Sequence, residues 1–221
     1  MQERGNSANI LREQPAFDPL VNPFHSSPND HDFILKNDQP SLPRPHGPWH
    51  IKSSQIVYTD PWVNVRRDEV VRPDGLPGSY AVITVKFGVC VVPIDEHGIV
   101  HLTQEFHYAV GRVTLEGVSG GIESGHGEDE TVHREMEEEL GIKASQIESL
   151  GTVDPFTGSV TSPTALFVAR GLTFGASSPE TTEQITHVQM TLDEAIAAVI
   201  DGRITHAPTC IILLRLGLSR H

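Results

Sequence analysis

The segment REMEEELG, residues 134–141, holds the densest group of acidic side chains in the sequence, with four glutamates between Glu135 and Glu139. The surrounding pattern predicts a helix over roughly Glu128 to Leu140, with Gly141 as its left-handed C-terminal stop. Negative charge at the C-terminal end of a helix opposes the helix dipole, and like charges one turn apart repel by roughly a few tenths of a kcal/mol per pair. An unfavourable cluster of this kind calls for a counter-charge.

The periodicity of the predicted helix places most of these carboxylates together. A helix turns by about 100° per residue, which gathers one buried apolar stripe made of Val132, Met136 and Leu140. Three glutamates share the flank of this stripe: Glu135, Glu138 and Glu139. Glu137 faces solvent. A divalent cation would remove the repulsion, and oxygen-only ligation selects Mg²⁺, Mn²⁺ or Ca²⁺ over Zn²⁺. The alternative interpretation is an ordinary solvated acidic face.

A glycine-rich loop, GVSGGIESGHG, precedes this helix and contains five glycines between Gly117 and Gly127. Glycine permits unusual backbone dihedrals and close backbone approach. The loop is therefore suited to present carbonyl oxygens to a metal or amide groups to a phosphate. Taken by itself, it is equally compatible with an ordinary flexible loop.

The elements that must position this loop and helix follow from alternation, turn chemistry and capping signals. A hairpin is expected around residues 73–78, and a capping box at Thr191 and Glu194 predicts a helix that ends at Gly202. A last apolar helix is expected over residues 207–218. The strand-like runs are 56–72, 79–94, 99–106, 148–154, 164–170 and 185–190. This order of strands, helix, strands and helices indicates an α+β layered domain.

Composition sets the wider limits. Eight of the sixteen prolines fall within residues 1–50, so we expect a mostly non-globular, proline-rich N-terminal arm over 1–47 and one domain over 48–221. The net charge of −13 argues against a binder of nucleic acid or of anionic membranes. Two cysteines make no disulfide framework, the first thirty residues carry no signal-peptide pattern, and residues 210–218 are too short to span a bilayer. The default expectation is a cytoplasmic protein.

The loop and helix together resemble the box of the Nudix hydrolases. That box reads Gly, five residues, Glu, seven residues, Arg-Glu, an apolar residue, any residue, Glu-Glu, any residue, Gly and an apolar residue. Eight of its nine defined positions match in this sequence: Gly120, Arg134, Glu135, Met136, Glu138, Glu139, Gly141 and Ile142. The ninth is His126, where the family has its first glutamate.

The resemblance extends over about residues 47–220. The stretch from Leu115 to Gly125 is similar to the Glu-x-x-Ala-Gly motif of ADP-ribose pyrophosphatases, with Glu116 as the glutamate and Ser119 in place of the alanine. Residues 154–169 are similar to the loop and strand after the box. Residues 180–196 resemble the acidic loop, strand and helix that close the fold of this subfamily.

This resemblance implies the Nudix fold, a mixed β-sheet sandwiched between helices (α/β/α), and a homodimer. It also implies hydrolysis of a nucleoside diphosphate linked to another moiety, with Mg²⁺ or Mn²⁺ as cofactor. The implied metal ligands are the Ser119 carbonyl and the side chains of Glu135, Glu138 and Glu139. The implied catalytic residues are Glu138, Glu139, Arg134 as the group that orients the carboxylates, and Glu183 as the group that activates water, with Glu180 as its alternative. Glu116 is implied to bind substrate.

Two departures leave the substrate open. The family's Gln-Tyr-Arg before the box is replaced by Glu105-Phe106-His107, which removes an arginine suited to phosphate. Arg112 is a candidate substrate-binding replacement, or a surface residue. His126 is a softer ligand, a neutral replacement, or a tolerated peripheral change. The remaining candidate histidines are interpreted as surface or satisfied core residues: His107, His133, His206 and His221.

Our leading hypothesis is a metal-dependent pyrophosphatase for ADP-ribose-like nucleotide sugars, which would yield AMP and ribose 5-phosphate. The alternative is a catalytically weak Nudix-fold module that binds nucleotides or regulates another protein, and a third possibility is a plain acidic scaffold.

Overall fold

A computed structural model describes residues 43–179 and 184–219 of the chain. The elements in chain order are β1 (Arg44–His46), β2 (Trp49–Thr59), β3 (Val63–Val71), β4 (Pro77–Val85), β5 (Gly88–Pro93), β6 (Ile99–His107), β7 (Arg112–Glu116), β8 (Val118–Gly121), α1 (Glu128–Leu140), β9 (Ile142–Val153), β10 (Val160–Thr161), β11 (Thr164–Phe174), β12 (Thr186–Thr191), α2 (Leu192–Ile200) and α3 (Ala207–Leu218).

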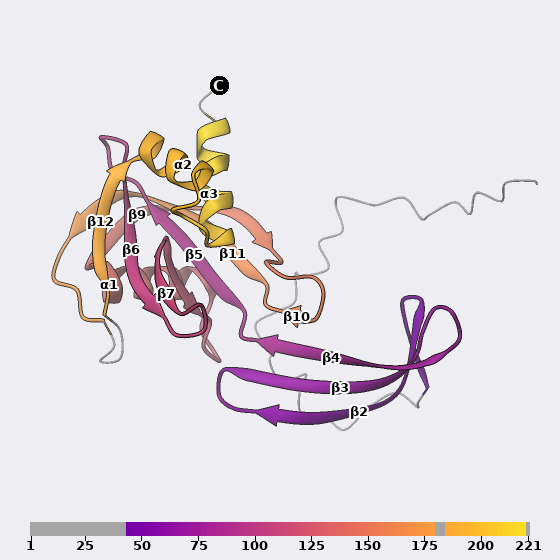
Figure 1. Cartoon of the computed structure of the whole chain (residues 1–221). Coiled ribbons are helices and arrows are strands. Elements are labelled where there is room, and N and C mark those ends of the chain that lie inside the picture. Colours follow the sequence, from indigo (N-terminus) through magenta and orange to yellow (C-terminus); the bar gives the residue numbers. More distant parts are fainter. Residues whose placement is uncertain (1–42, 180–183, 220–221) are drawn as a thin grey trace, which may run out of the picture.

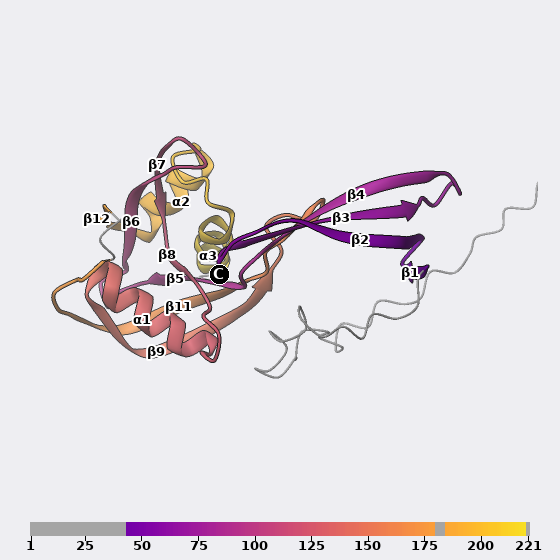
Figure 2. The same ribbon diagram turned by 90° about the horizontal axis from the view of Figure 1, so that it is seen from below.

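A four-stranded mixed sheet of order β8-β5-β11-β9 forms the centre of the molecule. Strands β5 and β11 run parallel, and the two outer strands are antiparallel to their neighbours. Because side chains alternate along a strand, Val89 and Val91 pack with α1, whereas Cys90 and Val92 pack with α2 and α3. Helices therefore cover both faces of this sheet (Figures 1 and 2). The expected layering of a mixed sheet between helices is confirmed.

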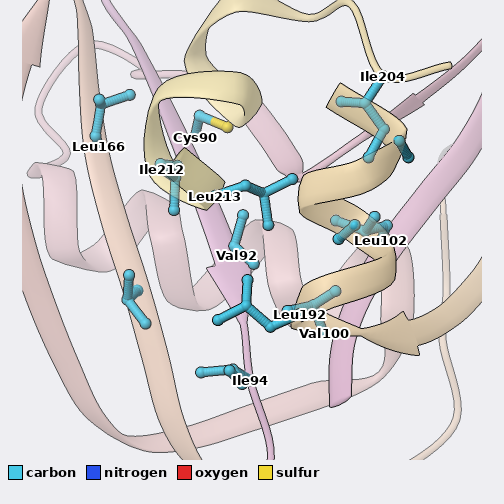
Figure 3. Packing of buried hydrophobic residues seen from close by; sticks show 13 residues of the cluster. Cys90, Val92, Ile94, Val100, Leu102, Leu166, Leu192, Ile204, Ile212 and Leu213 are labelled. Atoms are coloured by element: carbon cyan, nitrogen blue, oxygen red, sulfur yellow. The ribbon is translucent and has the colours of Figure 1, made fainter. Parts of the chain in front are cut away.

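The two faces of the central sheet carry separate cores. On the α1 face, Val132, Met136 and Leu140 are buried, which confirms the predicted apolar stripe of the acidic helix. On the other face, Leu192 and Leu213 from α2 and α3 meet Val92 of β5 (Figure 3). Burying each such aliphatic side chain stabilises the fold by about 1.5–3 kcal/mol. The acidic helix is thus held rigidly against the sheet by its apolar side.

A three-stranded antiparallel sheet of order β12-β6-β7 lies beside the central sheet. The chain crosses from β7 to β8 at Gly117, so the glycine-rich loop begins where two sheets meet. A Cβ atom at Gly117 would lie 2.8 Å from the carbonyl oxygen of Val91. This crossing leaves no room for a side chain. It connects Glu116, at the end of β7 in one sheet, to Ser119 in β8 of the next.

The sheet of order β1-β2-β3-β4-β10, called the first sheet because it contains the first strands of the chain, extends from the rest of the molecule (Figure 1). The hairpin predicted around residues 73–78 is confirmed, with Val71 opposite Pro77. Two expected single runs are corrected. Residues 56–72 contain a turn at Asp60, whose carboxylate accepts from the Trp62 and Val63 amides. Residues 79–94 divide after Val85 into strands of different sheets.

The ends of the expected helices agree closely with the structure. Helix α1 spans Glu128–Leu140, and Gly141 follows with φ 64°, where its amide donates to the Glu137 carbonyl at 3.0 Å. The capping box of Thr191 and Glu194 is present at the start of α2. Strand β1 lies within the predicted arm and pairs with β2, so Arg44–His46 of the arm belong to a sheet. In the described ranges, no helix combines the length and the apolar character needed to cross a bilayer.

Candidate active site

Arg134 is the centre of charge on the box helix. Its Nη2 donates to Glu135 Oε1 at 2.7 Å and its Nη1 donates to Glu138 Oε2 at 3.0 Å. Glu135 is the more buried partner, with 12% of its side chain exposed. Glu137 lies apart and pairs with Lys143 at 2.8 Å. The separation of Glu137 from the other carboxylates follows the predicted helical periodicity, and the guanidinium holds two of the remaining three in fixed positions.

Glu123 of the glycine-rich loop adds to this charge network. Burial acts to lower the pKa of Arg134, but the carboxylates of Glu135, Glu138 and Glu123 raise it above its ordinary value. His126, which stands at the position of the first box glutamate, instead lies 3.0 Å from Glu130 one helical turn later. The charge of Glu123 thus acts on Arg134, whereas His126 is paired with Glu130. The box spacing gave no reason to assign this role to Glu123.

Gly120 is the point where loop and helix touch. A Cβ atom at this position would lie 2.0 Å from Glu135 Oε1. The carboxylate of Glu135 therefore occupies the space that any other residue would fill. This contact is the close approach that the glycine-rich sequence predicted, and it seats Glu135 directly beside Ser119.

Cys90 lies next to the site, and the pKa of its thiol depends on the groups around it. Burial raises the pKa of its thiol to about 12, the hydroxyls of Ser119 and Thr209 oppose the rise, and the charges of Glu116 and Glu139 add to it. Cys90 is fully buried and belongs to the core on the α2 and α3 face of the central sheet. Since Glu116 of β7 and Glu139 of α1 both act on one sulfur atom, the two carboxylates belong to the same part of the molecule.

The predicted metal ligands fit a hard divalent cation in their chemistry. Glu135, Glu138 and Glu139 offer oxygen ligands only, and Glu135 is seated beside Ser119. Over residues 43–179 and 184–219, no three His, Cys, Asp or Glu side chains are gathered as a ligand set. Arg134 holds two of the predicted ligands by hydrogen bonds. A cation would have to compete with this guanidinium for the carboxylates.

Glu116, predicted to bind substrate, is surrounded by hydrogen-bonding groups. Thr114 Oγ1 donates to its Oε1 at 2.6 Å. His107 Nε2 lies 3.3 Å from Oε1, and His206 Nδ1 lies 3.4 Å from Oε2. We call His107, Glu116 and His206 the histidine cluster. These histidines come from β6 and from the residue before α3, so no local spacing indicated their meeting.

Thr209 ties the histidine cluster to the β7–β8 crossing. Its hydroxyl accepts from the Gly117 amide at 2.8 Å and lies 2.8 Å from His206 Nδ1. Burial lowers the pKa of His206, the charge of Glu116 opposes this change, and His107 adds to it. The neutral imidazole of His206 is therefore favoured in the folded protein.

Arg112 lies at the edge of the histidine cluster. It is opposite His107 in the β6–β7 hairpin, and its Nη2 donates to Thr205 Oγ1 at 2.7 Å, next to His206. The side chain is exposed, so Arg112 is a surface residue. It also lies close enough to the histidine cluster to remain a candidate for substrate binding. Its contact with substrate stays a prediction.

Glu183 and its alternative Glu180 lie outside the described residues. The chain before them is anchored at the box helix, because the Ser178 amide donates to the Glu138 carbonyl at 2.8 Å and the Gly175 amide donates to the Gly141 carbonyl at 2.7 Å. After them, Ile185 packs against the α1 core.

A cavity of about 590 Å³ lies apart from the predicted site residues, between the first sheet and the loop that leads into β10. Trp49 and Tyr80 meet in it edge to face, with ring centroids 5.6 Å apart. Arg66 Nε donates to both carboxylate oxygens of the buried Asp68, at 2.9 and 3.2 Å. This cavity offers aromatic faces and one charged pair.

A mixed sheet between helices, with a glycine loop packed onto an acidic helix, defines a Nudix-type hydrolase. Comparison with protein families agrees: the NUDIX domain matches residues 85–208, and the nucleoside diphosphate sugar hydrolase N-terminal domain matches residues 49–83. The chain therefore belongs to the Nudix hydrolase family and is a pyrophosphatase of that family, acting on compounds linked through a nucleoside diphosphate.

Individual relatives are distant. The chain is 26% identical over 171 residues to the methanol dehydrogenase activator of Bacillus methanolicus, covering 76% of this chain and 92% of that protein. It is 27% identical over 121 residues to the ADP-ribose pyrophosphatase of Mycobacterium tuberculosis, covering 54% and 58%. A crystal structure of an ADP compounds hydrolase superposes with a TM-score of 0.67 at 21% identity, covering 76% of this chain and 93% of that one, which supports the fold.

Proposed function

We propose that this protein hydrolyses ADP-ribose-like nucleotide sugars to AMP and ribose 5-phosphate in a reaction that depends on Mg²⁺ or Mn²⁺. The observation that carries the proposal is the seating of Glu135 against Gly120, with Arg134 holding both Glu135 and Glu138. Relatives named ADP-ribose pyrophosphatase, in Mycobacterium tuberculosis and Bacillus subtilis, support this choice of substrate.

The side chains of Glu135, Glu138 and Glu139 and the carbonyl of Ser119 would hold the cation. When bound, it supplies charge neutralisation and polarises the phosphorus–oxygen bonds of the diphosphate. Arg134 fixes the rotamers of two of these carboxylates, so that little order is lost when they bind a ligand. Glu116 and Arg112 are the proposed contacts to the substrate.

Glu183 is the proposed acceptor of the proton from the attacking water, with Glu180 as the alternative. Support comes from the neighbouring chain, since Ser178 is hydrogen-bonded to the carbonyl of Glu138 on the box helix. A carboxylate that reaches the attacking water contributes roughly 10²–10⁴-fold as a general base. Glu183→Gln and Glu180→Gln variants distinguish the two candidates. Only the variant that lacks the proton acceptor should have a lower kcat.

The test is turnover by the full chain. Purified protein with Mg²⁺ or Mn²⁺ is incubated with ADP-ribose, and AMP is measured by chromatography beside a panel of other nucleoside diphosphate compounds. We expect AMP from ADP-ribose and no product in the presence of a chelator. Faster hydrolysis of another compound in the panel would identify that compound as the substrate in place of ADP-ribose. No product from any compound with either metal would refute hydrolysis.

A catalytically weak nucleotide-binding module is the second candidate. The observation in its favour is that Arg134 occupies two predicted metal ligands while His126 is turned to Glu130. Tight binding of ADP-ribose without product, measured with Mn²⁺ present, would establish this second function.

We infer that the aromatic cavity of the first sheet receives the nucleobase, because stacking on Trp49 and Tyr80 suits a planar ring. Trp49 and Trp62 are the two tryptophans of the chain. In a Trp62→Phe variant, AMP should therefore quench the remaining fluorescence and ribose 5-phosphate should not. Equal quenching by both, or by neither, would contradict the assignment.

We also propose a homodimer formed through the first sheet. Its strands β2–β4 extend from the molecule and expose large apolar side chains, among them Ile56, Val57, Tyr58 and Trp62. Exposed apolar surface of this kind is typical of association surfaces. Light scattering should give a mass near twice 24.2 kDa, and a Val57→Glu, Trp62→Glu variant should shift it toward the monomer. A monomeric mass for the unaltered protein would refute the dimer.

A further inference from the structure

The histidine cluster contains two titratable side chains that the box does not use. His107 and His206 approach opposite oxygens of Glu116, at 3.3 and 3.4 Å. Both histidines keep part of their side chains exposed, 39% for His107 and 26% for His206, while Glu116 keeps 14%. The carboxylate is thus nearly covered by imidazoles that a ligand can still reach.

The position of the cluster connects it to the proposed reaction. Glu116 is followed by Gly117, whose amide is held by Thr209, and then by the Ser119–Gly120 segment against which Glu135 packs. Glu116 and Glu139 act on the same thiol of Cys90. A diphosphate that approaches the box carboxylates therefore comes close to His107 and His206 as well.

The charge of this region depends on the two imidazoles. The other charged groups that face them are Glu116 and Arg112 on β7 and Glu105 on β6, where Glu105 is opposite Thr114. Two carboxylates and one guanidinium leave a net negative charge when both imidazoles are neutral, and the sign becomes positive when both are protonated. An anion is repelled by the first state and attracted by the second.

We propose that the anionic diphosphate of the substrate binds against His107 and His206, and that these imidazoles take up protons from solvent as it binds. The inference rests on the proposed function, since it concerns the substrate of that site. No bond to phosphorus changes in this step: each proton adds to a ring nitrogen, and the imidazolium then donates to a phosphate oxygen. His107 and His206 are thereby substrate-binding residues that favour doubly charged diphosphates over neutral sugars.

The energetics of the free protein agree with this linkage. Burial keeps the pKa of His206 below its ordinary value, so this imidazole is neutral before the ligand arrives. A phosphate in contact with it favours the charged form. Binding and proton uptake are therefore coupled, and affinity should fall as the pH rises through the range in which imidazoles lose their protons.

The direct test is calorimetry with α,β-methylene ADP and Mg²⁺, because this probe carries the diphosphate and resists hydrolysis. Titrations at one pH in buffers of different ionisation enthalpy give the number of protons taken up. We expect net uptake near pH 7 and an affinity roughly tenfold weaker at pH 8 than at pH 6. Binding of the probe with no proton uptake, or no binding at either pH, would overturn the inference.

Three variants refine the test. His107→Gln and His206→Gln should each reduce the proton uptake and flatten the dependence of affinity on pH. His107→Arg supplies a permanent charge, so it should restore affinity at pH 8 while uptake stays reduced. His97→Gln is the matched control, because His97 is exposed and pairs with Glu96 at 3.5 Å, outside the cluster. Uptake unchanged in both His107→Gln and His206→Gln would contradict the proposal.

The outcome also separates this inference from the proposed function. Turnover of ADP-ribose with a KM that does not depend on pH would refute proton-linked binding and leave hydrolysis intact. Proton-linked binding of the probe without turnover of any diphosphate would support the inference and refute hydrolysis. Thermal unfolding of each variant shows whether a loss of binding comes from a loss of folding.

Discussion

Carboxylates lie on both sides of the Gly117–Gly120 segment, and different basic side chains contact them. On the box side, the guanidinium of Arg134 pairs with Glu135 and Glu138. On the other side, the imidazoles of the histidine cluster approach Glu116. A guanidinium stays charged at every accessible pH, whereas an imidazole changes charge near neutrality. The first arrangement keeps acidic groups in place, and the second makes the local charge adjustable.

This contrast shows how glutamates within one site can differ in function according to the side chain that pairs with them. Permanent pairing lowers the repulsion among box glutamates before any ligand binds. Adjustable pairing leaves Glu116 with a partner in the free protein and can add positive charge when an anion arrives.

The largest effect is expected for Glu139→Gln. This change removes one charge from the proposed ligands, so we expect kcat/KM to fall by roughly 10²–10³-fold with either metal. Glu137→Gln is the matched control on the same helix, since Glu137 pairs with Lys143 and faces away. Steady-state kinetics with ADP-ribose measures both. Equal losses in the two variants would remove the distinction between the box flank and the solvent face.

A smaller effect is expected for Gly120→Ala. The new methyl group would lie 2.0 Å from Glu135 Oε1, so the flexible carboxylate must move away. We expect kcat/KM to fall by about 10–100-fold with a loss of stability of only about 1 kcal/mol. Gly121→Ala is the neighbouring control, because its Cβ would meet the Lys86 side chain at 3.5 Å, an ordinary contact. Steady-state kinetics and thermal unfolding measure both variants. Equal changes in kcat/KM and stability would argue against the close contact between Glu135 and Gly120.

Arg134→Lys tests the permanent cation itself. A lysine ammonium cannot reproduce the fork by which separate Nη atoms reach Glu135 and Glu138. We expect kcat/KM to fall by about tenfold, equally at pH 6 and pH 8, because both cations stay charged in this range. Arg67→Lys is the control, since Arg67 pairs with Glu69 on the exposed side of strand β3. A loss of kcat/KM that increased with pH would contradict the view that the charge on the box side is independent of pH.

The smallest effect concerns stability and pH. Because the folded-state pKa of His206 lies below the ordinary value of 6.5, the unfolded chain binds the proton more readily. The stability that the neutral imidazole contributes is present above about pH 6.5 and is lost as the pH falls toward the folded-state pKa. Denaturant unfolding should therefore show a loss of stability between pH 7 and pH 5 that His206→Gln reduces. The same pH slope in both proteins would show that His206 does not titrate below its unfolded value.

Local features of the chain were predictable because they depend on neighbouring residues. The range of α1, the stop at Gly141 and the separation of Glu137 from the other box glutamates all follow from helical periodicity and capping. The division of residues 79–94 was not predictable, because the run stays β-rich across Lys86 and Phe87 while its halves join different sheets. Glu183 and the metal ligands stay predictions.

The sequence by itself determined the family, the acidic helix and the glycine loop, since spacing along the chain carries that information. Only the tertiary structure decided that Glu135 fills the space at Gly120, that the charge of Glu123 acts on Arg134, and that His107 and His206 meet at Glu116. Contacts between distant segments depend on how sheets and helices pack, and packing brings together residues whose separation in the chain contains no signal of their meeting.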